Sequence, residues 1–159
     1  MNRGQPIRPS SKPIVISSPT RNRAPDGSYK AKLLHHMTSD SHFGAKIELI
    51  FQIDNPNTPL HGKEFGIFFP VEKVIKPIGP NGEFVPKGYS SKLAKFLGVC
   101  KEILGIDSDL SMEMLCKISW VIKLTSPTLD ADKKLIPEGS RYSIIQEAIP
   151  ISKQDLSDW

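Results

Sequence analysis

The chain has 159 residues, a formal net charge of +4 and a sequence pI near 9.1. This length fits one domain with tails, and the modest positive charge favours a polyanionic partner. No apolar run is as long as a membrane span, and the first residues lack the hydrophobic core of a signal peptide, so we expect a cytoplasmic protein without a membrane partner. Cys100 and Cys116 show no metal or redox spacing, which indicates buried thiols in a reducing compartment.

Basic residues are concentrated in the first part of the chain. Residues 1–27 hold five Arg or Lys against one acid, and residues 28–101 hold ten Lys against six acids. Residues 102–159 reverse the balance, with six basic and ten acidic residues. We therefore expect the basic, partner-facing surface in the N-terminal part of the chain.

Residues 1–24 are predicted to form a basic flexible arm. This part of the chain is rich in Pro, Ser, Asn and Arg, and such a composition is too polar to fill a core. The apolar run at residues 14–16 is the exception. It is either an edge strand or clip on the domain, or simply a part of the arm.

Three strand-like runs follow, at residues 28–37, 45–53 and 64–71. Alternate residues of a strand face opposite sides of the sheet. On this basis the side chains predicted to face inward are those of Tyr29, Ala31, Leu33, Met37, Ile47, Leu49, Phe51 and Ile53. The side chains predicted to face outward are those of Lys30, Lys32, Leu34, His36, Lys46, Ile50 and Phe68.

Two hairpins are predicted in this half of the chain. The first joins the first two strands through a loop at residues 38–44, with His42 and Phe43 at its tip. The second is a small hairpin between Val74 and Val85, whose turn is rich in Gly, Pro and Asn.

An amphipathic helix is predicted over residues 91–104, because apolar residues recur there at three- and four-residue spacings. Strand-like runs follow at residues 116–124 and 141–149, separated by a long loop at residues 126–140. This order predicts a mainly β fold, namely a five-stranded OB-like barrel over residues 25–150 with one helix between the third and fourth strands.

The outward side of the first three strands carries cations and flat rings, which single-stranded nucleic acid needs for its phosphates and its bases. Alternatively, Leu34, Ile50 and Phe68 are covered by the N-terminal arm or by the hairpin near Gly82, and Phe43 is an ordinary exposed aromatic on a turn. The predicted nucleic-acid-binding residues, which include two lysines of the long loop, are Lys30, Lys32, His36, Phe43, Lys46, Phe68, Lys133 and Lys134.

Residues 151–159 are predicted to form an acidic C-terminal tail. Its two aspartates, terminal carboxylate and indole suit an apolar pocket ringed with Arg or Lys on a protein partner. The alternative is a solvated tail with a chance aromatic. The predicted partner-binding residues are Asp155, Leu156, Asp158 and Trp159.

No sequence pattern indicates catalysis, a cofactor or a metal site. The four histidines do not fall in a ligand spacing with the cysteines, and adjacent histidines on a strand point to opposite faces. Asp107, Asp109 and Glu113 are typical of a solvated loop and helix start. The sequence also lacks a Gly-rich phosphate loop and a nucleophile elbow, so we expect a non-catalytic protein without a cofactor.

Six short segments within residues 25–149 carry a resemblance to a known family. They are Pro25-Asp26-Gly27-Ser28-Tyr29, the hairpin of residues 35–51, His61-Gly62-Lys63, the helix at residues 91–104, Ile136-Pro137-Glu138 and Tyr142-Ser143-Ile144-Ile145. Together they resemble the single-stranded-DNA-binding proteins that phages and mobile elements encode.

In that family an OB barrel coats single strands, and an acidic tail tipped by an aromatic recruits replication or recombination enzymes. The resemblance implies these roles for the lysine-rich outward side and for the C-terminal tail. It also implies a cytoplasmic location in a bacterial cell or a phage-infected host.

Two functions of different classes therefore stay open. The first is non-catalytic binding of single-stranded DNA in the replication or recombination of a phage or mobile element. The alternative is a mobile-element protein that binds and inhibits a host protein. A third outcome is a structural subunit of a larger assembly, docked through the basic arm.

Overall fold

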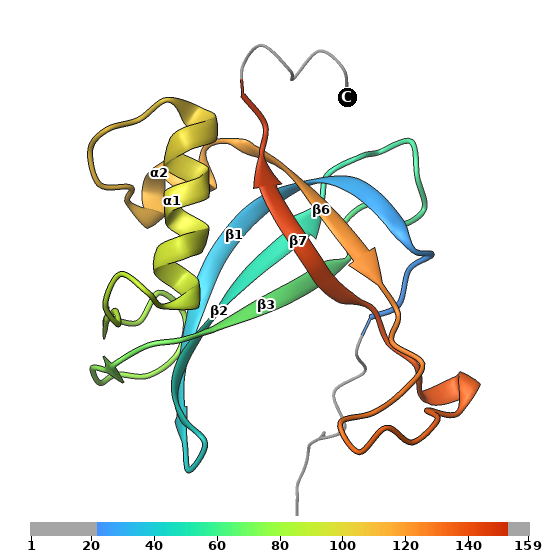
Figure 1. The fold of residues 1–159 in the computed structure, drawn as a ribbon. Helices are drawn as coiled ribbons and strands as arrows, with labels where there is room; N and C mark the ends of the chain where they lie inside the picture. The colour runs from blue at the N-terminus through green and yellow to red at the C-terminus, as the bar shows by residue number, and fades with distance from the viewer. Residues whose placement is uncertain (1–21, 153–159) are drawn as a thin grey trace, which may run out of the picture.

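The structure is a computed structural model, and it describes residues 22–152. Its main element is a five-stranded antiparallel sheet with the strand order β3-β2-β1-β6-β7 (Figure 1). The prediction of a mainly β fold with five principal strands is confirmed. These strands are β1 (Gly27–Ser41), β2 (Gly44–Ile53), β3 (Glu64–Pro70), β6 (Ser119–Thr125) and β7 (Ile144–Pro150).

Between β3 and β6 the chain forms a small hairpin and two helices. The hairpin pairs β4 (Lys73–Val74) with β5 (Phe84–Val85), as the sequence predicted. The helices are α1 (Lys92–Leu104) and α2 (Met112–Cys116). The structure thus departs from the predicted single helix, because a second helix, α2, follows α1 before the next strand of the main sheet.

The ends of α1 follow from its capping residues. The Ser91 hydroxyl oxygen accepts a hydrogen bond from the Ala94 amide at 3.1 Å and satisfies one of the unpaired donors of the first turn. Gly105 ends the helix in a left-handed conformation, with φ of 68°, which a residue without a side chain adopts at little cost. These caps fix the orientation from which Leu93 and Cys100 enter the core.

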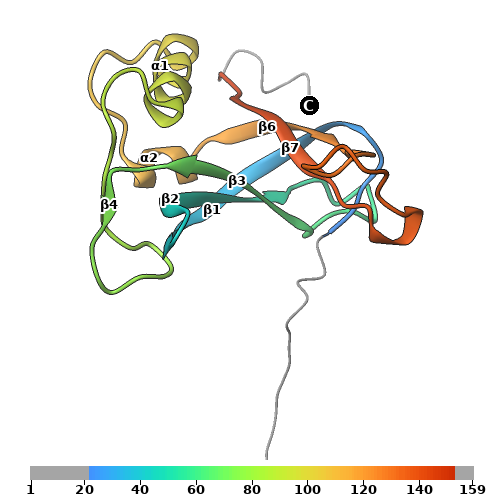
Figure 2. The same ribbon diagram turned by 60° about the horizontal axis from the view of Figure 1, so that its bottom comes forward.

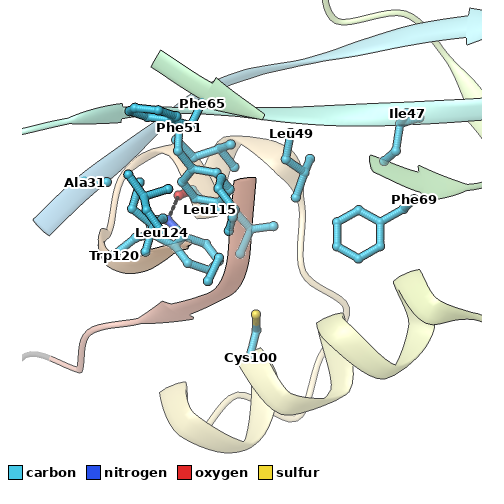
Figure 3. Packing of buried hydrophobic residues seen from close by; sticks show 14 of the residues in the cluster. Ala31, Ile47, Leu49, Phe51, Phe65, Phe69, Cys100, Leu115, Trp120 and Leu124 are labelled. Carbon is cyan, nitrogen blue, oxygen red and sulfur yellow. Dashed lines mark hydrogen bonds between the residues drawn. The ribbon is translucent and has the colours of Figure 1, made fainter. Parts of the chain in front are cut away.

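The core lies between the curled sheet and α1 (Figure 3). Trp120 of β6 is fully buried at its centre. Its indole Nε1 donates a hydrogen bond to the carbonyl oxygen of Leu115 at 2.9 Å. The indole stacks on Phe96 with centroids 5.9 Å apart and forms a T-shaped contact with Phe51, with centroids 5.2 Å apart. This cluster ties α1, α2 and the sheet into one hydrophobic unit.

The sheet is not a closed barrel, which corrects that part of the prediction. It curls so that β6 and β7 lie above β2 and β3 (Figure 2), but β3 and β7 are its two edges and no ladder joins them in the described part of the chain. The two strands start close together and then diverge (Figure 1). α1 contacts both of them, so the helix lies against both edges at the place where they diverge.

A β-bulge changes which residues of β1 face the core. The pairing of β1 with β2 shifts between Leu33 and His35, which inserts one extra residue into β1. Before the bulge Ala31 and Leu33 are buried, and after it His36 and Thr38 are buried. The predicted alternation is therefore wrong beyond the bulge, since it placed His36 outward.

Candidate nucleic-acid interface

The best-defined contact on the outward side of the sheet joins Lys46 of β2 to Phe68 of β3. The Lys46 Nζ lies 4.8 Å from the centroid of the Phe68 ring, within the range of a cation–π interaction. The two residues are diagonal neighbours, because Phe68 pairs with Glu48 and Lys46 pairs with Pro70. The Phe68 residue is 48% exposed. A cation and an accessible ring therefore lie side by side, as a nucleotide with its phosphate and base requires.

Lys30 and Lys32 lie on the same outward side but near its other end. Lys32 pairs with Gln52 of β2, and both lysines pair with residues of β6. Lys46 and Gln52 are six residues apart along β2, which corresponds to about 20 Å. The three predicted lysines thus mark the two ends of one sheet side and do not form a single cluster.

A carboxylate lies between these two groups. Burial raises the pKa of Glu48 above its ordinary value, and the positive charges of Lys46 and His35 partly oppose that rise. His35 pairs with Ile50 on the neighbouring strand. The middle of the outward side is therefore mixed in charge, with a half-buried acid between the cationic ends.

His36 is not part of this surface, which corrects its predicted position. It is only 7% exposed, and its Nε2 lies 2.7 Å from the carbonyl oxygen of Gly82. Its ring forms a T-shaped contact with Phe84, with centroids 5.5 Å apart. His36 therefore anchors the β4–β5 hairpin to β1, because the bulge has turned its side chain inward.

The tip of the first hairpin extends the Lys46 end of the surface. β1 and β2 stay paired up to the turn, so the predicted loop at residues 38–44 contracts to His42 and Phe43. Gly44 follows with φ of 113°, a conformation that favours glycine. Phe43 is 84% exposed, and its ring lies 3.9 Å from that of His42 between centroids. The tip thus presents a second flat surface.

Lys133 and Lys134 lie in the loop that follows β6, far from the hairpin tip in both views (Figure 1, Figure 2). The Asp130 Oδ1 accepts hydrogen bonds from the amides of Asp132 and Lys134, each at 2.9 Å. This side chain shapes the loop into a tight turn that exposes both lysines. The structure does not bring them together with the tip.

A groove of about 700 Å³ runs between the diverging strands β3 and β7. Its lining includes Phe68 and Glu64 of β3, Tyr142 before β7, and Lys92 at the start of α1. The Lys92 Nζ donates to the carbonyl oxygen of Phe68 at 3.4 Å and lies 5.3 Å from the centroid of the Phe69 ring. Phe68 therefore contacts Lys46 through its ring and Lys92 through its main-chain carbonyl, and it connects the outward surface to the groove.

Sequence reasoning missed one exposed aromatic. Tyr89 is 99% exposed in the segment between β5 and α1, with Lys87 and Lys92 close by in the chain. Residues 72–95, which include the β4–β5 hairpin, hold five lysines against two glutamates. The signal was present in the sequence as Lys-Gly-Tyr-Ser-Ser-Lys at residues 87–92, where a ring lies between two cations at the start of the predicted helix.

Burial keeps both cysteine thiols in their protonated form. Burial raises the pKa of the Cys100 thiol to about 12 and also raises the pKa of Cys116. Across residues 22–152, no three His, Cys, Asp or Glu side chains are grouped so that they would hold a metal ion. No helix in that range has the length and apolar character needed to cross a membrane.

Two predicted segments lie outside the described residues. One is the greater part of the N-terminal arm, including the run at residues 14–16. The other holds all four predicted partner-binding residues, namely Asp155, Leu156, Asp158 and Trp159.

No protein-family model matches the chain, and a search of curated proteins finds no significant match.

Proposed function

We propose that this protein binds single-stranded DNA without catalysis, in the replication or recombination of a phage or mobile element. The observation that carries the proposal is the Lys46–Phe68 pair, a cation 4.8 Å from a half-exposed ring on the outward side of the sheet. Lys30 and Lys32 extend the same side toward its other end. Rings that stack bases beside cations that follow phosphates are the usual elements of such sites.

The strand order supports an OB-like assignment for this fold. The order β3-β2-β1-β6-β7 is that of an OB barrel opened between its third and fifth principal strands, and OB barrels are commonly only partly closed. In that fold the outward side of the second and third strands, with the loops beside it, binds oligonucleotides. Lys46 and Phe68 lie on the corresponding strands here.

The surface suggests moderate rather than tight binding. Each phosphate contact contributes about 0.7 to the salt slope for a single strand, so three lysines give a slope of about −2 in a plot of log K against log salt. Each stacked base adds roughly 1–3 kcal/mol. The carboxylate of Glu48 opposes phosphate binding, because it adds negative charge between the lysines.

Titration of labelled oligo-dT by fluorescence anisotropy at several salt concentrations tests the proposal. The double variant Lys32→Glu/Lys46→Glu is expected to lose at least tenfold in affinity at low salt. The matched control is Lys101→Glu/Lys117→Glu, which changes charge equally on the helical side, where both lysines pair with acids. Equal losses in the two variants would contradict the assignment of this surface, and absence of binding by the unaltered protein would contradict the function.

A protein partner is the second candidate function, and a separate groove favours it. This groove, of about 480 Å³, lies between α1, α2 and the end of β7. Its lining is mostly apolar and includes Ile103, Leu104, Met114 and Ile118. An apolar groove beside a helix suits a protein segment better than a phosphate backbone. A protein that bound a host factor but not oligo-dT would support this reading over the first.

A further inference from the structure

The groove between β3 and β7 exposes main-chain hydrogen-bonding groups along one side. The amide of Ile53 donates to the carbonyl oxygen of Lys63, and the amide of Val71 donates to that of Ala45. These two hydrogen bonds lie at the two ends of the β2–β3 ladder. Because paired and unpaired positions alternate in an antiparallel ladder, the odd-numbered residues of β3 bond to β2. The main-chain groups of its even-numbered residues therefore face the groove.

Side chains already use two of these groups. The Asn22 Nδ2 donates to the carbonyl oxygen of Glu64 at 2.8 Å, and the Lys92 Nζ donates to that of Phe68 at 3.4 Å. The amide and carbonyl of Gly66 lie between them and face the groove. β7 is the other edge of the sheet, so two open strand edges border one channel. Such edges readily accept an added strand.

The chain enters the described structure at one end of this groove. Asn22 lines it, and the Asn22 carbonyl oxygen accepts a hydrogen bond from the Ser143 amide at 3.1 Å. The Ser143 hydroxyl also accepts from the Ala24 amide at 2.8 Å and donates to the Ala24 carbonyl oxygen at 3.1 Å. These bonds hold residues 22–24 against the start of β7. Asn22, which directly follows residues 1–21 in the chain, is therefore held at a fixed point inside the groove.

We propose that residues 14–16, Ile-Val-Ile, bind in this groove as a short strand between β3 and β7. This is the only run of consecutive large apolar residues in the first 21, and all three are β-branched, which favours strands. Pro13 and Pro19 bracket the segment, as prolines do at the ends of strands.

Reach and charge both fit this occupant. Ile16 precedes Asn22 by six residues, which span at most about 20 Å, whereas β3 from Glu64 to Phe68 is about 13 Å long. The run can therefore reach the Phe68 end of the groove. Residues 1–21 carry four basic residues, and the groove lining holds two acids, Glu48 and Glu64, against one lysine, Lys92.

Amide hydrogen exchange followed by NMR on the full-length chain tests the proposal. Exchange is measured without nucleic acid, so the result does not depend on DNA binding. The amides of Gly66 and Phe68 face the groove, whereas the Ile67 amide bonds to β2 and serves as an internal reference. The test variant is Ile14→Asp/Ile16→Asp. The control is Ile7→Asp/Ser10→Asp, which adds the same charge to the same arm outside the run.

The Gly66 and Phe68 amides are expected to exchange at least tenfold faster in the test variant than in the unaltered protein and the control. The Ile67 amide is expected to keep its protection in all three proteins, which would show that the sheet is intact. Equal exchange of Gly66 and Phe68 in all three would overturn the proposal. Protection that rose with protein concentration would also overturn it, because a second copy would then supply the strand.

Discussion

The carboxylate of Glu48 lies directly over the backbone of Gly66. A Cβ added at residue 66 would clash with that carboxylate, so the glycine leaves the space that the acid occupies. Gly66 pairs with Ile50 and Phe68 pairs with Glu48, which places this contact next to the Lys46–Phe68 pair. An acid is thereby held half-buried in the middle of the proposed DNA-binding surface.

Replacing Glu48 with Gln is expected to stabilise the fold at neutral pH. Burial raises the folded-state pKa of Glu48 above the ordinary value of 4.5. The protonated Glu48 side chain therefore contributes its full stabilisation of the fold below about pH 4.5. This contribution is lost as the pH rises through the pKa of Glu48 in the folded state. Thermal melts should show a gain in Tm of about 1–3 °C at pH 7 and no gain near pH 4. A gain that persisted at pH 4 would contradict this origin.

The same variant is expected to bind oligo-dT more tightly, by roughly two- to fivefold at low salt, since it removes one negative charge close to Lys46. The control Glu113→Gln, on α2, should leave the affinity unchanged. The gain should shrink as salt rises, because salt screens the charge.

Truncation of Phe68 is expected to weaken DNA binding with little loss of stability. Phe68→Ala removes a half-exposed ring and should cost roughly 1–3 kcal/mol of binding free energy if one base stacks there. Phe68→Tyr keeps the ring and should retain most of the affinity. Anisotropy titrations and thermal melts on both variants separate the effects. A large fall in Tm with unchanged affinity would mean that Phe68 is covered, as the alternative interpretation of the sequence holds.

The strands were predictable from alternation, and the helix from its period and caps, because both depend on residues close in the sequence. The bulge in β1 was not. Leu33, Leu34 and His35 give no local sign of an extra residue, since a bulge is a property of pairing with β2. Because of this one-residue shift in register, the side chains of His36 and Met37 lie on the sides of the sheet opposite to those predicted. The open edge of the sheet was equally hidden, because it depends on where α1 packs.

Both thiols are expected to react slowly with a thiol reagent in the folded protein. Burial raises the pKa of Cys100 to about 12, so at pH 8 only about one thiol in ten thousand is ionised. The Cys116 Sγ donates to the Leu34 carbonyl oxygen at 3.7 Å and is only partly buried. We expect Cys116 to react first, in labelling of the Cys100→Ala and Cys116→Ala variants. Rapid labelling of Cys100 without denaturant would contradict its burial.

Trp120→Phe is expected to be among the most destabilising conservative changes in the core. The smaller ring leaves a cavity beside Phe96 and removes the indole donor, so the buried carbonyl oxygen of Leu115 loses its 2.9 Å hydrogen bond. Cavity and unpaired acceptor together should cost about 2–4 kcal/mol. Urea unfolding followed by circular dichroism measures the loss without depending on the altered fluorophore. A separate double-mutant cycle of Trp120→Leu with Phe96→Leu, in which each variant removes one ring, isolates the ring stacking, expected at about 0.5–1.5 kcal/mol. A loss below about 1 kcal/mol for Trp120→Phe alone would mean that neighbouring side chains collapse into the space and that another donor reaches Leu115.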